Sequence, residues 1–248
     1  MKQCFILRTH LWDEVNKRLA EQYCQDLFNY CDFIVCLNVK DKSNLNIISN
    51  WLQFCNDNNI KLCLMCESDI YRDYPHYKGV WLHSQNTFIY CYQKLAQYDY
   101  YWFVEYDLRF TGSIKEVLMD HEFYIHDLLG THIEDYNSSK EWYWWNEQNI
   151  NLDIELKNRY KYFPAISRLS YRLLNKLSID AKITYSVIES YVPTICVKYF
   201  GINSLHNLDT KFWTSNTVRY SPIHGNDNFY QQSIKNDNYN LLFHPIKG

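Results

Sequence analysis

Glycine, proline and charge of a single sign are all scarce in this chain. Only 6 Gly and 5 Pro occur among 248 residues, which predicts a dense fold with few sharp turns. Lys and Arg number 25 against 28 Asp and Glu, for a formal net charge of −3, and no long run of either sign is present. This balance argues against nucleic acid as a partner, because phosphate binding needs concentrated positive charge.

Long apolar runs are missing as well. No segment approaches the roughly 18 apolar residues of a membrane-spanning helix, and residues 1–10 lack the basic and apolar stretches of a signal peptide. The 9 Cys are an odd number, and several lie within apolar runs such as 33–37, as buried reduced thiols do. We therefore expect no transmembrane segment and a cytoplasmic location, with peripheral association at the inner face of the membrane as the further option.

Cys63 and Cys66 have the two-residue gap of a zinc-binding or redox pair. No second pair follows at metal-binding spacing, and both residues lie in a strand-like apolar run. Structural thiols are therefore favoured over a zinc site.

Hydrophobic and aromatic residues are abundant. The hydrophobic share of 47%, against 21% charged residues, excludes a disordered or fibrous chain and suffices for a full core. Tyr, Phe and Trp make up 18%, with 23 Tyr alone. A base-composition bias is the first explanation for most of the Tyr, and stacking surfaces for nucleobases and sugars are the functional alternative.

The first half of the chain alternates between two hydrophobic periods. Strand-like runs lie at 4–7, 33–39, 60–66 and 100–104, helical spacing at 12–28, 45–56 and 84–96, and a loop at 68–79. Strands separated by helices predict an α/β fold with a mostly parallel sheet and crossover helices.

The second half is less regular. We expect a short helix at 115–119, strands at 127–131 and 163–167, helices at 170–177 and 192–201, and an apolar strand or helix at 183–188. No internal repeat divides the chain, so we expect one domain whose second half covers the carboxyl edge of the sheet and shapes a pocket there.

Two carboxylates, Glu105 and Asp107, follow the fourth predicted strand. Open parallel sheets bind their ligands at this edge. Carboxylates two residues apart can face one divalent cation, for example one that bridges a nucleotide diphosphate. The alternative is an acidic loop that caps a helix.

The segment Tyr100–Gly112, YYWFVEYDLRFTG, resembles the central motif of the GT-A type of nucleotide-sugar glycosyltransferases, in which an Asp-x-Asp-like element follows a hydrophobic strand. It is most similar to a group of fungal and bacterial proteins with the signature W-x-x-E-Y-D-x-R-x-T-G. The segment Tyr77–Asn86 is similar to the one that encloses the nucleotide diphosphate in those proteins. Together with the alternating elements, the resemblance extends from Met1 to about Gly130.

This resemblance implies a GT-A (Rossmann-like) sheet in a single domain, 1–248, with a nucleotide-sugar-binding half at 1–112 and an acceptor-binding half at 113–248. It implies a hexosyltransferase of polysaccharide biosynthesis that moves a sugar from a nucleotide diphosphate donor, UDP-sugar first, to a glycan or glycolipid acceptor. The donor-binding candidates, from fold position and resemblance, are Arg8, Thr9, Glu67, Lys78, Trp81, Asn86, Glu105, Asp107, Arg109 and Lys247.

The segment Ile188–Thr194, IESYVPT, is similar to the E-x-x-x-P-T stretch of inverting transferases of the core-2 branching type, in which a Glu acts as base. Glu189 would hold that role and remove the proton of the acceptor hydroxyl. Asp135, beside Glu134, is the competing base. A carboxylate that caps a helix near Pro193 is the alternative for Glu189.

The expected cation is Mn²⁺ or Mg²⁺, with Glu105 and Asp107 as ligands and His244 as the late third ligand that GT-A enzymes often supply. The chain departs from the common pattern because its first acidic residue is Glu105 rather than Asp. Some relatives of the core-2 type work without metal and neutralise the diphosphate with basic residues. Lys247 is the candidate for that second solution.

Trp142, Trp144 and Trp145 cluster in a polar loop, where they form either an acceptor-binding platform or lid, or a core plug beneath the loop. Two other functions stay open. One is a carbohydrate or nucleotide-binding module without turnover. The other is a nucleotidyltransferase, against which the lack of a Gly-rich loop after the first strand counts.

Overall fold

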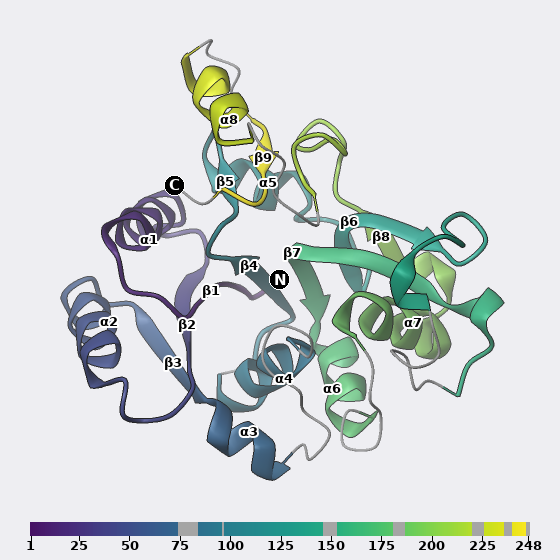
Figure 1. Ribbon diagram of the computed structural model, residues 1–248, viewed down its shortest axis with the longest axis horizontal. Coiled ribbons are helices and arrows are strands. Elements are labelled where there is room, and N and C mark those ends of the chain that lie inside the picture. Colours follow the sequence, from purple (N-terminus) through teal and green to yellow (C-terminus); the bar gives the residue numbers. More distant parts are fainter. Residues whose placement is uncertain are drawn as a thin grey trace.

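The computed structural model describes residues 1–73, 84–95, 97–145, 153–180, 187–219, 226–235 and 240–246. Within these ranges, seven strands form a central sheet and two more form a small second sheet. Figure 1 shows that helices cover both faces of the central sheet.

The first half has the alternation that the sequence predicts. Its elements are β1 (Gln3–Thr9), α1 (Glu14–Asp26), β2 (Asp32–Val39), α2 (Leu45–Asp57), β3 (Lys61–Cys66), α3 (Glu67–Asp73), α4 (Gln85–Lys94) and β4 (Tyr100–Glu105). The predicted loop is wrong at its start, where α3 follows β3 directly. Glu67 and Asp69 in the first turn and Arg72 in the last complement the dipole of this helix.

The second half contains more regular structure than its sequence indicates. Its elements are β5 (Arg109–Phe110), α5 (Ile114–Asp120), β6 (Leu128–Asp135), η1 (Tyr143–Trp145), η2 (Leu156–Asn158), β7 (Tyr160–Ser170), α6 (Tyr171–Asp180), α7 (Ile188–Phe200), η3 (Ile202–Ser204), β8 (Leu205–Asn207), α8 (Asn226–Lys235) and β9 (Leu242–Phe243). The strand predicted at 163–167 is the middle of the longer β7, and the helix predicted at 192–201 begins earlier. Residues 183–186 of the remaining prediction lie outside the described residues.

The central sheet has the strand order β3-β2-β1-β4-β7-β6-β8. Neighbouring strands are parallel except at β7, which is antiparallel to both β4 and β6. The expected α/β fold with a mostly parallel sheet flanked by helices is thus confirmed, while the reversed β7 was not predicted. Because the other strands share one direction, the carboxyl ends of β1, β4 and β6 meet the start of β7 at one edge.

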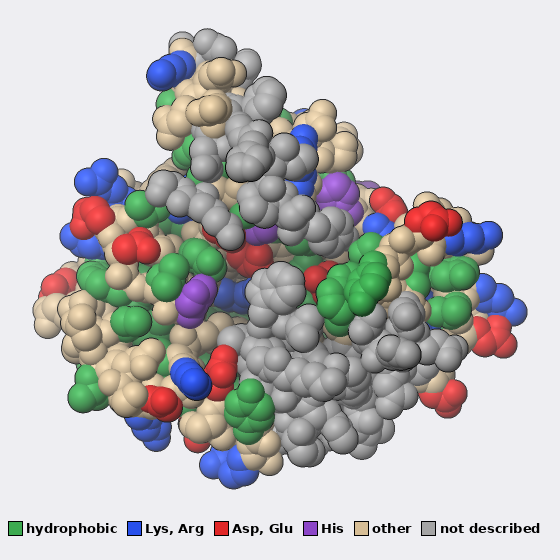
Figure 2. Space-filling model, in the orientation of Figure 1, with side chains coloured by type: hydrophobic (Ala, Val, Ile, Leu, Met, Phe, Trp, Pro, Cys, Tyr) green, Lys and Arg blue, Asp and Glu red, His purple; other side chains and the backbone are tan. Residues whose placement is uncertain are grey.

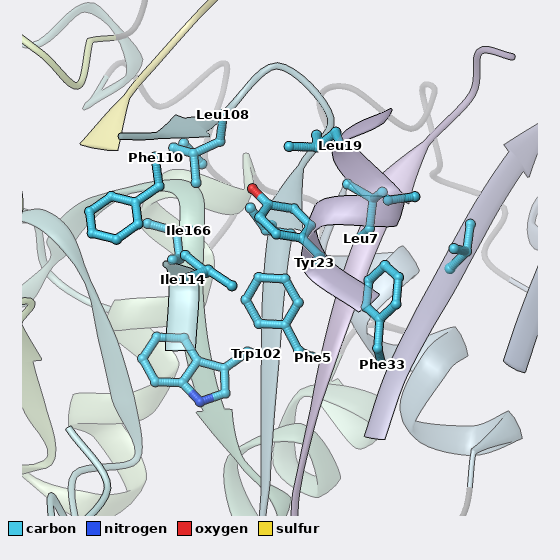
Figure 3. Close-up of a cluster of buried hydrophobic side chains, with 14 of the residues drawn as sticks. Phe5, Leu7, Leu19, Tyr23, Phe33, Trp102, Leu108, Phe110, Ile114 and Ile166 are labelled. Atoms are coloured by element: carbon cyan, nitrogen blue, oxygen red, sulfur yellow. The ribbon is translucent and has the colours of Figure 1, made fainter. Parts of the chain in front are cut away.

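Alternating side chains of the sheet divide the core into two layers. In β1, Cys4 and Ile6 point to the layer under α3, α4, α6 and α7, whereas Phe5 and Leu7 point to the layer under α1, α2 and α5. Figure 3 shows this second layer, in which Tyr23 of α1 packs edge-on against Phe5 with 5.1 Å between ring centroids. Much of the aromatic surplus therefore stabilises the two layers by burial of ring surface.

Cys63 and Cys66 lie in different core layers, Cys63 under α4 and Cys66 on the opposite face of the sheet. Side chains three positions apart on a strand point to opposite faces. The two-residue gap therefore does not make a chelating pair here.

None of the helices within the described ranges combines the length and the apolar character that a membrane crossing needs.

Candidate active site

Arg8 and Glu105 stand at the carboxyl ends of the neighbouring strands β1 and β4. They are register partners, so their side chains project from the same face of the sheet. Arg8 Nη2 donates a hydrogen bond to Glu105 Oε1 at 2.6 Å, and the guanidinium lies 5.0 Å from the centroid of the Phe88 ring. Arg8 is thus held between a carboxylate and an aromatic face.

A turn after β4 brings Asp107 to the same edge as Glu105. The Leu108 amide donates to the Glu105 carbonyl at 3.1 Å. Arg109 Nη1 donates to the carbonyls of Tyr106 and Leu108, at 2.6 and 2.9 Å. Arg109 therefore braces the backbone of the acidic turn.

β9 pairs with β5, which follows the turn that carries Asp107. This pairing places His244, the residue after β9, beside Asp107. Its Nε2 lies 3.1 Å from Glu105 Oε2 and 3.1 Å from Asp107 Oδ1. The other ring nitrogen, Nδ1, lies 2.9 Å from the Arg219 carbonyl oxygen and is the donor there, because a carbonyl only accepts. The imidazole is therefore fixed with Nε2 facing both carboxylates.

The charges of this cluster shift the pKa values of its members in opposite directions. Burial lowers the pKa of His244, but hydrogen bonds to Asp107 and Glu105 and their charges outweigh it and raise the pKa to about 10. Burial raises the pKa of Glu105, but His244 and Arg8 outweigh it and hold the pKa below its ordinary value. In the absence of a metal, the imidazolium is a cation between two carboxylates.

The donor set of Glu105, Asp107 and His244 fits a divalent cation. One ligand atom from each residue lies within 4.8 Å of the others. The two 3.1 Å separations from Nε2 match the spacing of about 3 Å between adjacent ligands in an octahedral site with bonds of about 2.1 Å. Asp107 Oδ1 is buried, and the contact that orients it is the 3.1 Å approach of His244 Nε2. Two carboxylate oxygens and an imidazole suit Mn²⁺ or Mg²⁺.

Figure 2 shows acidic, basic and histidine side chains meeting near the middle of one face of the molecule. In the orientation of Figure 1 this place lies over the ends of β1 and β4. Charged and histidine side chains therefore gather on this face at the edge predicted from the strand directions.

Glu189, the predicted base, lies in the first turn of α7 and is half-buried. Burial of the carboxyl group raises its pKa to about 7; the charge of Glu105 also raises the pKa, and the charge of Arg8 lowers it. Pro193 lies inside α7 and has no N–H to donate to the Glu189 carbonyl four residues earlier. Glu189 thus lies at the start of a helix, as predicted for a helix-terminal carboxylate. It is also close enough to Glu105 for the charge of that residue to affect its pKa.

Asp135 and Glu134, the competing bases, lie at the end of β6. Asp135 Oδ1 accepts a hydrogen bond from the Ser138 amide at 2.7 Å, and such bonds lower its pKa. Glu134 forms an ion pair of 2.9 Å with Lys161. Both acidic residues line a groove of about 640 Å³ between β6 and β8. Asp135 and Glu134 are thus bound to partners next to them, Ser138 and Lys161.

The three tryptophans of the predicted platform differ in burial. Trp145 is buried, donates through Nε1 to the Ser139 carbonyl at 2.7 Å, and packs edge-on against Trp142 at 4.8 Å between centroids. Trp142 and Trp144 are partly buried against the core. Trp145 is thus a core plug, while the other two keep exposed surface.

The remaining donor-binding candidates are spread more widely. Thr9 is buried and its hydroxyl bonds to the backbone of Leu11, and Asn86 is buried in the first turn of α4. Glu67 starts α3 at the end of β3. Lys78, Trp81 and Lys247 lie outside the described residues.

Two aromatic residues at the start of β7 belong to the site and were not predicted. Tyr162 is fully buried, its pKa is raised by burial, and the charges of Arg8, Glu189 and Glu105 act on it. The Phe163 ring lies 5.0 Å from that of His244. Aromatic residues are so frequent in this sequence that neither had a distinguishing signal.

No protein-family model matches the chain, and no curated protein matches it by sequence. Three solved structures of glycosyltransferases resemble it. The apo structure of the bifunctional glycosyltransferase WbbM has a TM-score of 0.50 at 9% identity, and covers 98% of this chain and 45% of that one. The galactosyltransferase LgtC, in complex with donor and acceptor sugar analogues, has a TM-score of 0.49 at 12% identity, with 87% and 77% covered. An active-site mutant of LgtC has a TM-score of 0.45 at 10% identity, with 91% and 81% covered.

The likeness to WbbM shows a shared fold, at an identity too low to carry more. This chain spans less than half the length of WbbM. The α/β fold expected for a GT-A protein is therefore present, and its bearing on activity depends on the site.

Proposed function

We propose that this protein transfers a sugar from a nucleotide diphosphate donor to a hydroxyl group of a glycan or glycolipid acceptor. The observation that carries the proposal is the convergence of Glu105, Asp107 and His244 at the carboxyl edge of the sheet, with Nε2 3.1 Å from each carboxylate. This edge is where open α/β sheets bind nucleotides.

Glu105, Asp107 and His244 would hold a Mn²⁺ or Mg²⁺ ion. When bound, the ion supplies positive charge that stabilises the leaving diphosphate. Arg8 fixes the Glu105 carboxylate through their 2.6 Å hydrogen bond, and the Arg219 carbonyl fixes the imidazole. Arg109 keeps Asp107 in place by bracing its turn. A donor of the UDP-sugar type is the first candidate.

Glu189 is the proposed base of an inverting transfer. Its carboxylate takes the proton of the acceptor hydroxyl while the hydroxyl oxygen forms a bond to the anomeric carbon. The bond from that carbon to the diphosphate oxygen breaks, and its electron pair leaves with the diphosphate. A pKa of about 7 suits a base that must bind a proton in one step and release it after the next. The exposed surfaces of Trp142 and Trp144 are proposed to contact the acceptor.

A screen of UDP-, GDP- and dTDP-linked sugars tests the proposal. We expect one donor to raise the melting temperature of the purified protein in Mn²⁺ and to lose this effect in EDTA. With that donor and a glycan acceptor, NMR of the product should reveal an inverted anomeric configuration.

Three outcomes would count against parts of the proposal. A bound donor that is neither transferred nor hydrolysed would indicate a binding module. Retention of configuration would remove Glu189 as the inverting base. No response to any nucleotide sugar would overturn the proposal as a whole.

A further inference from the structure

Four residues form a row across the sheet, one strand after another: Cys63 in β3, Cys36 in β2, Arg8 in β1 and Glu105 in β4. Each is the register partner of the next. Register partners on adjacent strands point to the same face, so all four side chains face the layer under α4. The acidic end of the row belongs to the candidate active site. The sulfur end has no role in the proposed transfer.

Cys91 of α4 packs onto the sulfur end of this row. The Sγ atoms of Cys36, Cys63 and Cys91 all lie within 4.8 Å of one another, and those of Cys63 and Cys91 are 3.9 Å apart. Cys36 and Cys91 are fully buried, and Cys63 exposes 5% of its surface. All three are free thiols. We call them the sulfur cluster.

The spacing of the sulfur cluster matches a three-coordinate metal site. Metal–sulfur bonds are about 2.3 Å long. Three such bonds at 120° to one another place the sulfurs about 4 Å apart, close to the 3.9 Å between Cys63 and Cys91. The other separations, at most 4.8 Å, exceed this value by less than 1 Å.

The donor set decides which ion fits. Within the described residues the group contains three sulfurs and no carboxylate or imidazole. Soft thiolates select Cu(I) and Zn²⁺ over hard cations. Structural zinc takes four protein ligands, one more than the three sulfurs that the described residues offer here. Three sulfurs satisfy Cu(I).

We propose that Cys36, Cys63 and Cys91 bind one Cu(I) ion. Thiol protons leave to solvent, sulfur electron pairs form the bonds to the ion, and copper stays in the +1 state throughout. The negative charge left on the cluster lies beside Arg8, the register partner of Cys36. The guanidinium of Arg8 is paired with Glu105 through Nη2, and its buried Nη1 makes no hydrogen bond to the described residues, so this N–H is the donor nearest to the cluster in the row. The proposal is independent of the proposed sugar transfer.

Anaerobic titration of the full chain with Cu(I), in competition with a chromogenic Cu(I) chelator, tests the proposal. We expect one tightly bound ion per chain, and X-ray absorption with three sulfur neighbours at about 2.3 Å. The variants Cys36→Ala, Cys63→Ala and Cys91→Ala should each weaken binding at least tenfold. Circular dichroism and melting temperature verify that each variant is folded.

Cys4→Ala is the matched control, because Cys4 is a buried free thiol in the same core layer and outside the cluster. It should bind Cu(I) as the unaltered protein does. Equal loss in Cys4→Ala, unchanged binding in any folded cluster variant, or an X-ray absorption spectrum with fewer than three sulfur neighbours would overturn the proposal. Tighter binding of Zn²⁺ than of Cu(I) would overturn the choice of ion.

Discussion

Two three-residue clusters lie on the same face of the sheet and differ in almost every property that governs ion binding. Glu105, Asp107 and His244 offer oxygen and nitrogen at the edge of the sheet. The sulfur cluster offers three thiols inside the core. Arg8 lies between them and is the register partner of a member of each. The comparison teaches that one row of a sheet can place a member of a hard-donor cluster and two members of a soft-donor cluster on opposite sides of a single strand.

Glu189→Gln should have the largest effect on the acidic side of this comparison. Because Gln cannot accept the acceptor proton, we expect kcat to fall about 10²–10⁴-fold. In the unaltered protein the rate should rise with pH through about 7, as Glu189 loses its proton. The variant should lack this rise. A kcat–pH profile measures both, and near-normal turnover in the variant would refute the base assignment.

The same residue predicts a pH effect on stability. The folded-state pKa lies above the ordinary 4.5, so the folded protein holds this proton more tightly than the unfolded chain. The contribution of Glu189 to stability should therefore fall as pH rises from about 4.5 to 7. Urea unfolding of the unaltered protein and of Glu189→Gln at both ends of this window measures the difference.

Asp107→Asn should affect the acidic cluster alone. We expect kcat/KM to fall about 10²–10³-fold, as when a group that stabilises developing charge is removed. The stabilisation by Mn²⁺ should be lost, while Cu(I) binding stays unchanged. Glu14→Gln, which alters an exposed carboxylate paired with Arg18 on α1, is the control. Loss of Cu(I) binding in Asp107→Asn would mean that the two clusters are one site.

Arg8→Met removes the residue shared by both clusters. It leaves Glu105 without its 2.6 Å partner, and we expect a loss of about 1–3 kcal/mol in stability because a partly buried charged acceptor is left with fewer partners. Cu(I) binding should weaken as well. Urea unfolding and the copper titration measure the two effects, and unchanged copper affinity would separate Arg8 from the sulfur cluster.

Cys91→Ala should have the smallest effect on stability. The change removes one sulfur from the core, and we expect a loss of about 1 kcal/mol from the small cavity. Urea unfolding of metal-free protein, with Cys4→Ala beside it, gives the comparison. A loss several times larger in Cys91→Ala alone would mean that packing is the main role of the cluster.

The first half of the fold could be predicted because each of its strands and helices has its own hydrophobic pattern in the sequence. Apolar runs of strand length alternate with helical spacing from Cys4 to Glu105, and β1 to β4 follow that pattern. The direction of β7 could not be predicted, because an apolar run has the same composition in either direction. The two-residue strands β5 and β9 are too short to leave a periodic signal.

The parts of the site could be predicted to different degrees. Glu105 and Asp107 follow a predicted strand, so their place at the sheet edge follows from the sequence. His244 lies 139 residues from Glu105 in the sequence. It could be predicted as a ligand only from the family resemblance, because the residues next to it in the sequence carry no metal-binding pattern. The sulfur cluster was missed because it depends on the register of β2 against β3 and on the rotation of α4. The sequence pattern instead pairs Cys63 with Cys66, which lies in the other core layer.

The backbone of His244 is also bonded to residues Thr217–Arg219, which precede α8 in the chain. Val218 and His244 form a bridge, and the amides of His244 and Arg219 bond to the carbonyls of Thr217 and His244. Residues 25 positions apart are thus joined by main-chain hydrogen bonds, in addition to the contact of the imidazole with the Arg219 carbonyl. Because these bonds use no side chain of Thr217 or Val218, substitution of either side chain should leave the backbone of His244 in place.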